Sequence, residues 1–287
     1  MKKNFVLLAG AMMALTACEK QSVDAVDAQY ETQKKELTFA VEGDFGAATF
    51  TRGAMTADGK QMTDLWVLDY MGGALVQQLH QTAEDDDFGS PSLTLDFGDH
   101  HVYFVASRGS SPTLDTDEHT VTWASTSDTF WTDYSVSVTS GTAAAHNVTL
   151  NRVATKLSVT IADELPDGTA YVEIIPATWY YGLDYLDGSA TEAQTSEPRT
   201  ITIPAAKIGT TGTTLSIFGL SGTVEWTTDV TVNACDGDDN VLGTATISDA
   251  PMTANRATCY SGNLFSGASG FDLSLNATWN DDQTGTW

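Results

Sequence analysis

Basic residues are scarce in this chain of 287 residues, because 13 lysines and arginines are outnumbered by 38 aspartates and glutamates and the formal net charge is −25. A surface this acidic repels the phosphates of nucleic acids and anionic lipids, so nucleic acid is excluded as a partner. Cysteine is also sparse, with three residues. For Cys235 and Cys259, the sequence leaves open whether they form a disulfide or stay as free thiols.

The sequence signatures of enzymes and cofactor sites are lacking as well. There is no G-x-S-x-G elbow, no H-E-x-x-H helix and no phosphate-binding glycine loop. The acidic run 236–240 has Val241 where a calcium loop needs glycine and Ile247 where it needs an acid, which favours a hairpin turn. Adjacent His100 and His101 would point to opposite faces of a strand, a poor start for a metal site. We therefore expect a protein that is not an enzyme and that has no metal or cofactor.

Long apolar runs are absent except near the N-terminus. Residues 1–17 combine two lysines with an apolar run that is too short to span a bilayer and is typical of a secretory signal. The run ends in Leu15-Thr16-Ala17-Cys18, which resembles the cleavage site of bacterial lipoproteins. We expect a lipid on Cys18 that anchors the mature chain to a membrane. An ordinary signal peptide with a chance cysteine is the alternative. Residues 18–35 are polar and are expected to form a flexible tether.

Short segments with alternating apolar and polar residues indicate β-strands over the rest of the chain. The first lies at 37–41 and the last at 271–275, and turn dipeptides such as Asp187-Gly188 separate the segments. Many short strands at this spacing are typical of β-sandwiches or barrels. Small residues near 141–146 interrupt the pattern. We therefore expect two β-sandwich domains, at residues 36–146 and 147–287.

Four features of the chain resemble the fimbrillin family, the lipoprotein subunits of type V pili. They are the lipoprotein signal at Cys18, two strands that flank the lone Arg52, the segment 150–159, and the segment 255–265 followed by a last strand. The resemblance covers essentially the whole mature chain. It implies an all-β fold of two transthyretin-like β-sandwich domains in tandem. It also implies a structural role in a cell-surface fimbria, with the chain located at the outer membrane and in the fimbrium.

The resemblance further implies a route of assembly with other fimbrial subunits as partners. In the family, a protease cuts after an arginine and removes the first strand, and a strand of a neighbouring subunit fills the groove. Here the cut would fall between Arg52 and Gly53. The removed strand would be the one that carries three alternating apolar side chains, Leu37, Phe39 and Val41. The donor strand candidate is the C-terminal segment with the same alternation, Phe271, Leu273 and Leu275.

Other interpretations stay open at this point. Arg52 would be merely an exposed residue if the chain is never cut. Because few residues follow Trp279, the chain is alternatively an anchor or accessory subunit that keeps its lipid and its first strand. A third alternative is a surface glycan-binding lipoprotein that contacts a host or bacterial ligand. Its candidate contact is an aromatic cluster that would otherwise pack over a sandwich edge, Trp179, Tyr180 and Tyr181.

Overall fold

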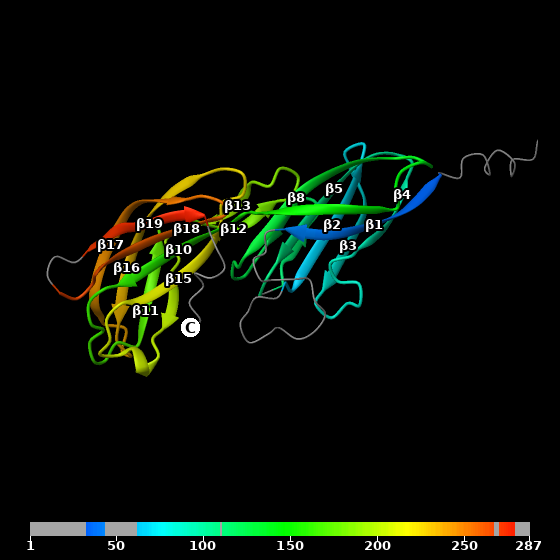
Figure 1. Cartoon of the computed structure of the whole chain (residues 1–287). Helices are drawn as coiled ribbons and strands as arrows, with labels where there is room; N and C mark the ends of the chain where they lie inside the picture. The colour runs from blue at the N-terminus through cyan, green and yellow to red at the C-terminus, as the bar shows by residue number, and fades with distance from the viewer. Residues whose placement is uncertain (1–32, 44–61, 110, 267–269, 279–287) are drawn as a thin grey trace, which may run out of the picture. The chain divides into compact units, whose positions relative to one another are not determined.

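The computed structural model describes residues 33–43, 62–109, 111–266 and 270–278 (Figure 1). These residues form strands and one short 3-10 turn, which confirms the all-β class that the sequence predicts. The earlier strands are β1 (Lys34–Gly43), β2 (Asp64–Met71), β3 (Ala74–Thr82), β4 (Ser92–Asp96), β5 (Gly98–Ser107), β6 (Thr113–Asp115), β7 (Thr120–Thr122), β8 (Thr129–Val138) and β9 (Ala145–Arg152). The later elements are β10 (Ala154–Ile161), β11 (Tyr171–Pro176), β12 (Trp179–Asp184), β13 (Ala190–Gln194), β14 (Arg199–Thr202), η1 (Ala205–Lys207), β15 (Thr213–Leu220), β16 (Trp226–Cys235), β17 (Val241–Met252), β18 (Arg256–Asn263) and β19 (Gly270–Thr278). Within the described ranges, no helix has the length and apolar character needed to cross a bilayer.

The first strand series forms a seven-stranded sheet in the order β3-β2-β5-β8-β9-β1-β4. Strands β8 and β9 pair only at Phe130↔Arg152 and Trp131↔Asn151. This sheet therefore consists of two smaller sheets, β3-β2-β5-β8 and β9-β1-β4, joined at the start of β8. The inward side chains of both smaller sheets form one buried cluster. Its members include Leu37, Phe39, Leu65, Val67, Leu93, Leu95, Val102, Phe104, Val148 and Leu150.

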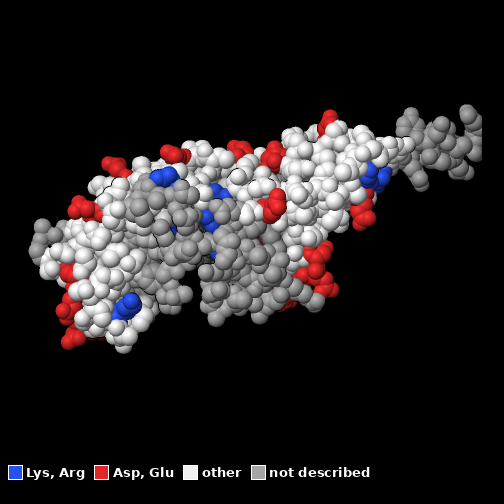
Figure 2. All heavy atoms as spheres, viewed as in Figure 1, with Lys and Arg blue, Asp and Glu red and all other residues white. Residues whose placement is uncertain are grey.

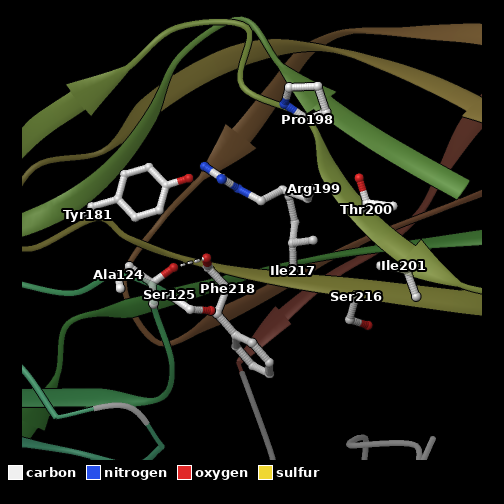
Figure 3. Close-up of a pocket in the computed structure, with 11 residues that line it drawn as sticks. Ala124, Ser125, Tyr181, Pro198, Arg199, Thr200, Ile201, Ser216, Ile217 and Phe218 are labelled. Carbon is white, nitrogen blue, oxygen red and sulfur yellow. Dashed lines mark hydrogen bonds between the residues drawn. The ribbon is translucent and has the colours of Figure 1, made fainter.

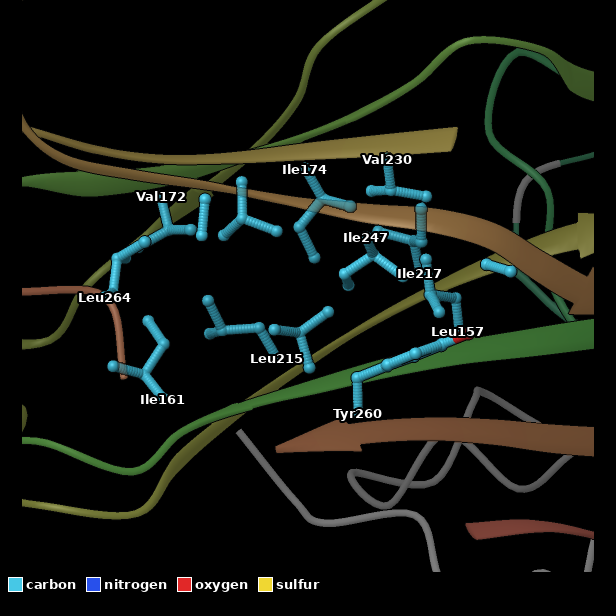
Figure 4. Packing of buried hydrophobic residues seen from close by; sticks show 14 of the residues in the cluster. Leu157, Ile161, Val172, Ile174, Leu215, Ile217, Val230, Ile247, Tyr260 and Leu264 are labelled. Carbon is cyan, nitrogen blue, oxygen red and sulfur yellow. The ribbon is translucent and has the colours of Figure 1, made fainter. Parts of the chain in front are cut away.

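The second strand series forms two four-stranded sheets, β15-β10-β18-β19 and β14-β11-β16-β17. Leu157 and Ile161 of β10 share one buried cluster with Val172 and Ile174 of β11 and with Val230 of β16, so the two sheets enclose a common core (Figure 4). The alternation that predicted these strands therefore reflects one buried and one exposed face on each.

A third four-stranded sheet, β13-β12-β7-β6, combines strands from both series. The pairing runs from Thr120 to Asp184 and from Thr122 to Gly182. A separate buried cluster lies here, in which the hydroxyls of Tyr70 and Tyr185 are hydrogen-bonded at 2.8 Å. The two strand series are thus connected by a shared sheet and a shared core, in addition to the chain that links β9 to β10.

The charge distribution and one hairpin turn correspond to sequence expectations, and the state of the two cysteines, which the sequence leaves open, is resolved. Figure 2 shows acidic side chains spread over the visible face and basic side chains at few places. Asp236 and Asn240 belong to the turn between β16 and β17. Hydrogen bonds from the Asn240 side chain and from the backbone N–H groups of Asn240 and Asp238 lower the pKa of Asp236. Cys235 and Cys259 lie in different sheets and are free thiols.

Candidate functional site

Strand β1 is enclosed on both edges by strands from later in the chain. Residues Lys34–Thr38 pair antiparallel with β4, and residues Thr38–Gly43 pair parallel with β9. Two further backbone hydrogen bonds, from Phe39 N–H to the Pro91 carbonyl at 2.9 Å and from Val41 N–H to the Gly89 carbonyl at 3.0 Å, extend the contact on the β4 side. The N-terminal strand is therefore an interior strand of its sheet, although it comes first in the sequence.

The side chains of β1 alternate between core and solvent, as the sequence predicts. Leu37 and Phe39 are 0% exposed, and Val41 is half-buried. The Phe39 ring lies among three other rings, with centroid distances of 5.4 Å to Phe104, 5.9 Å to Tyr134 and 5.6 Å to His146. These contacts place Phe39 at the centre of the groove between β4 and β9, which we call the β1 groove.

The predicted processing residues Cys18, Arg52 and Gly53 lie outside the described residues. Lipidation and cleavage therefore stay predictions.

The predicted donor segment forms β19, which pairs antiparallel with β18 as the outer strand of its sheet. Phe271 packs against the core of that part of the chain, and Leu273 is 51% exposed. Leu275 lies opposite Cys259 in the backbone register. In this structure the segment is thus part of the chain's own sheet.

The predicted aromatic cluster is mostly buried. Trp179 is 1% exposed, and its Nε1–H donates to the Phe218 carbonyl at 2.9 Å. Tyr180 is half-buried and packs edge-on against Trp226, with ring centroids 5.1 Å apart. The Trp179 ring therefore serves packing in this fold, and Tyr181, which is also buried, lines a cavity.

A buried ionic network connects two of the segments that carry the family resemblance. Arg152 donates through Nε to Asp128 Oδ1 at 2.7 Å and through Nη1 to Asn255 Oδ1 at 2.9 Å. A second guanidinium, that of Arg108, lies 3.3 Å from the other oxygen of Asp128. Charge-assisted hydrogen bonds of this kind are strong when they are buried. Sequence reasoning missed Asp128, because it lies in a short polar stretch with no periodic signal.

A second carboxylate, that of Asp163, binds the end of the segment 255–265, which also carries the family resemblance. Asp163 accepts hydrogen bonds from the backbone N–H groups of Leu264, Phe265 and Ser266, at distances between 2.7 and 3.2 Å. Partial burial of this carboxylate opposes its ionisation, but the hydrogen bonds outweigh that effect and lower the pKa of Asp163.

His100 and His101 point to opposite faces, as alternation predicts, with His100 buried and His101 exposed. The Nε2 atom of His100 lies 2.9 Å from the Asp96 carbonyl, which can only accept, so this nitrogen carries a proton. The Nδ1 atom lies 2.8 Å from the Asp69 carboxyl group. Burial raises the pKa of Asp69, and the hydrogen bond between Asp69 and His100 opposes the increase. The two groups form a buried structural pair in the sheet.

Comparison with known proteins concerns the fold. No model of a known family and no curated protein matches the chain. A solved structure from Bacteroides thetaiotaomicron, assigned to polysaccharide-binding proteins, matches with a TM-score of 0.52 at 9% identity, over 86% of this chain and 99% of that chain. A fimbrial assembly protein from Parabacteroides distasonis matches with a TM-score of 0.45 at 10% identity, over 80% and 92% of the two chains. The tip fimbrial protein Mfa3 from Porphyromonas gingivalis matches with a TM-score of 0.45 at 12% identity, over 85% and 100%. At these identities the likeness concerns the fold alone.

Proposed function

We propose that the chain is a structural, non-enzymatic subunit of a cell-surface fimbria, exported as a lipoprotein with its lipid on Cys18 and assembled by exchange of β-strands. In this proposal its two strand series, β1–β9 and β10–β19, correspond to two transthyretin-like β-sandwich domains. Because β9 (Ala145–Arg152) pairs with β1 and shares its core, the boundary that we propose follows β9 instead of the 146/147 boundary expected from the sequence. The observation that carries the proposal is the place of β1. A strand that comes first in the sequence lies inside a sheet, between two strands from later in the chain, β4 and β9. A single cut after Arg52 would separate that strand from the rest of the chain.

The consequence of removing β1 can be estimated from its contacts. Among the described pairings, β4 pairs with β1 alone, so it would lose its place in the sheet. Strand β9 would expose unpaired backbone groups along Ala145–Leu150. Burial of a large apolar side chain contributes about 1.5–3 kcal/mol. The loss of Leu37 and Phe39 would therefore leave an apolar groove whose filling by another strand is strongly favoured.

The donor that we propose is the C-terminal segment of a neighbouring subunit. Phe271, Leu273 and Leu275 repeat the spacing of the three apolar residues of β1, so they could enter the same three positions of a β1 groove. Donation would require β19 to leave β18. The exposed Leu273 at the outer edge of that sheet fits a strand that is held less firmly than β1.

The cleavage claim is tested by N-terminal sequencing of the protein extracted from surface fibres. We expect a mature N-terminus at Gly53 and, for Arg52→Ala, a longer chain that keeps β1 and is not incorporated. Lys60→Ala is the matched control, because it removes a basic residue from the same stretch between β1 and β2. If fibres of the Arg52→Ala protein form normally, or if Lys60→Ala blocks them equally, cleavage after Arg52 is not the trigger.

A second candidate role is that of an anchor or accessory subunit that keeps its lipid. Assembled fibres would then contain the chain with a lipidated Cys18, which mass spectrometry of the N-terminal peptide detects. A third candidate, a glycan-binding lipoprotein of the outer membrane, is favoured by the match to a structure assigned to polysaccharide binding. Its contact would include Tyr180, the aromatic residue of the predicted cluster that is half-buried rather than buried. Loss of glycan-array binding in Tyr180→Ala would support that role over the structural one.

A further inference from the structure

A cavity of about 320 Å³ lies between β12, β14 and β15 (Figure 3). Its wall comes from four regions: the segment 124–126 before β8, Tyr181 on β12, and the stretches 198–201 and 216–218. Tyr181 and Ile217 are buried, whereas Ser125, Pro198 and Thr200 are exposed. The cavity thus has a closed floor and an accessible rim. Its volume is at the lower end of the range for small-molecule sites, about 300–1,000 Å³.

The floor of this cavity holds two polar groups without partners. The guanidinium carbon of Arg199 lies 4.3 Å from the centroid of the Tyr181 ring, and Figure 3 shows the tip of Arg199 directed toward Tyr181. Among the described residues, neither the Nη2 atom of Arg199 nor the hydroxyl of Tyr181 has a hydrogen-bond partner, although both atoms are buried. Tyr181 as a whole is 4% exposed. Leaving such a donor unpaired is costly, and more so when it is charged.

An acceptor with negative charge would satisfy both the Nη2 atom of Arg199 and the hydroxyl of Tyr181. Among the described residues that line the cavity there is no aspartate or glutamate, in a chain that has 38 acidic residues. A carboxylate offers two acceptor oxygens, which suit one N–H edge of a guanidinium and a neighbouring hydroxyl. A phosphate dianion fits less well, because the acidic surface of the chain repels higher charge more strongly. The stacked Tyr181 ring holds the guanidinium in place, so little side-chain entropy is lost on binding.

The rest of the lining favours a sugar over an acidic peptide side chain. Ser125, Thr200 and Ser216 bring hydroxyl groups to the wall, while Ile201 and Ile217 provide aliphatic surface. A pyranose ring presents hydroxyls at its edge and C–H groups on its face, so it matches this combination. An aspartate or glutamate side chain would use only the carboxylate position.

We propose that this cavity binds a carboxylate-bearing sugar residue, such as a uronic acid unit of an acidic polysaccharide, through Arg199 Nη2 and the Tyr181 hydroxyl. The site lies away from the β1 groove, and its occupation does not depend on fimbrial assembly. It also differs from stacking on the aromatic cluster, because the contribution of Tyr181 is its hydroxyl and not its ring face.

Titration calorimetry of the full mature chain with D-glucuronate, D-galacturonate and D-glucose tests the site. We expect binding of at least one uronate and none of glucose. Arg199→Gln should weaken uronate binding about tenfold or more, because it removes a charge-assisted contact. Tyr181→Phe keeps the ring on which Arg199 stacks and should weaken binding several-fold. Lys207→Gln, which removes an exposed positive charge from η1, is the matched control and should bind like the unchanged chain.

Three outcomes would overturn the proposal. Absence of uronate binding by a folded chain, verified by circular dichroism, rules out the site. Equal uronate binding by the unchanged chain and by folded Tyr181→Phe and Arg199→Gln places the ligand elsewhere. Equally tight binding of a glutamate-containing peptide and of the uronates shows a carboxylate site without preference for a sugar. If Arg199→Gln does not fold, weaker uronate binding by folded Tyr181→Phe than by the unchanged chain supports the proposal.

Discussion

Replacing Phe39 with alanine would empty the centre of the β1 groove. The ring is 0% exposed and has three ring neighbours with centroids within 6 Å, so no solvent or flexible side chain can fill the space easily. Truncation of a buried phenylalanine typically costs about 3–5 kcal/mol, through lost burial and the cavity left behind. Because a folded chain is stable by only about 5–15 kcal/mol, this change should be clearly visible.

Urea unfolding of the uncut chain, followed by tryptophan fluorescence, measures the loss directly. Glu36→Gln is the matched control on the same strand, since Glu36 is exposed and its replacement should change the free energy of unfolding by less than about 0.5 kcal/mol. A loss below about 1 kcal/mol for Phe39→Ala would refute the described position of β1, because a fully buried ring cannot be removed so cheaply.

The same substitution tests whether the apolar side chains of β1 hold the strand in its groove after the chain is cut. A site for a sequence-specific protease, inserted between Arg52 and Gly53, allows the strand to be cut free in vitro. The same 3–5 kcal/mol corresponds to about two to three and a half orders of magnitude in the equilibrium for strand release. Size-exclusion chromatography should show the fragment retained in the unchanged protein and lost in Phe39→Ala. Retention in both would mean that the apolar side chains do not hold the strand.

Three further predictions concern carboxyl groups. Asp128→Ala leaves Arg108 and Arg152 without their shared carboxylate and should cost about 3–5 kcal/mol in urea unfolding, whereas Asp133→Ala, on the exposed face of β8, should cost little. The pKa of Asp163 is lower in the folded state, so its contribution to stability is present above the unfolded pKa and is lost as the pH falls through the folded pKa. The loss of stability in Asp163→Asn, measured in thermal melts, should therefore shrink on acidification. A loss that does not change with pH would disprove the role of the backbone donors. The pKa of Asp69 is raised, so the folded state binds the extra proton and stability falls as the pH rises from the unfolded value through the folded pKa. Asp69→Asn should therefore gain stability relative to the unchanged chain over that interval, and a constant difference would contradict the assignment.

The sequence predicts local features of this chain well, because alternation reports which face of a strand is buried. Leu37 and Phe39 are buried, and His100 and His101 diverge, as that pattern requires. Alternation carries no information about the neighbour of a strand. The parallel pairing of β1 with β9 and the antiparallel pairing with β4 were therefore not predictable from it.

The polar sites were less predictable for the same reason. Arg199 begins the short strand β14 directly after a polar stretch, and only the fold brings it to Tyr181 on β12. The aromatic cluster was recognised from composition, but the sequence could not tell that Trp179 would be buried while Tyr181 would line a cavity. Asp128 gave no signal, because its partners Arg108 and Arg152 become neighbours only through long-range pairing.

The sheet β13-β12-β7-β6 has a mechanical consequence for a chain under tension. Its β7–β12 pairing and the hydrogen-bonded tyrosines Tyr70 and Tyr185 connect the two strand series sideways, in the buried cluster that also contains Val153 of the short β9–β10 connection. A pulling force that reaches one series is therefore shared between a covalent link and a hydrogen-bonded, apolar contact. The two series should extend together at one rupture force instead of yielding one after the other.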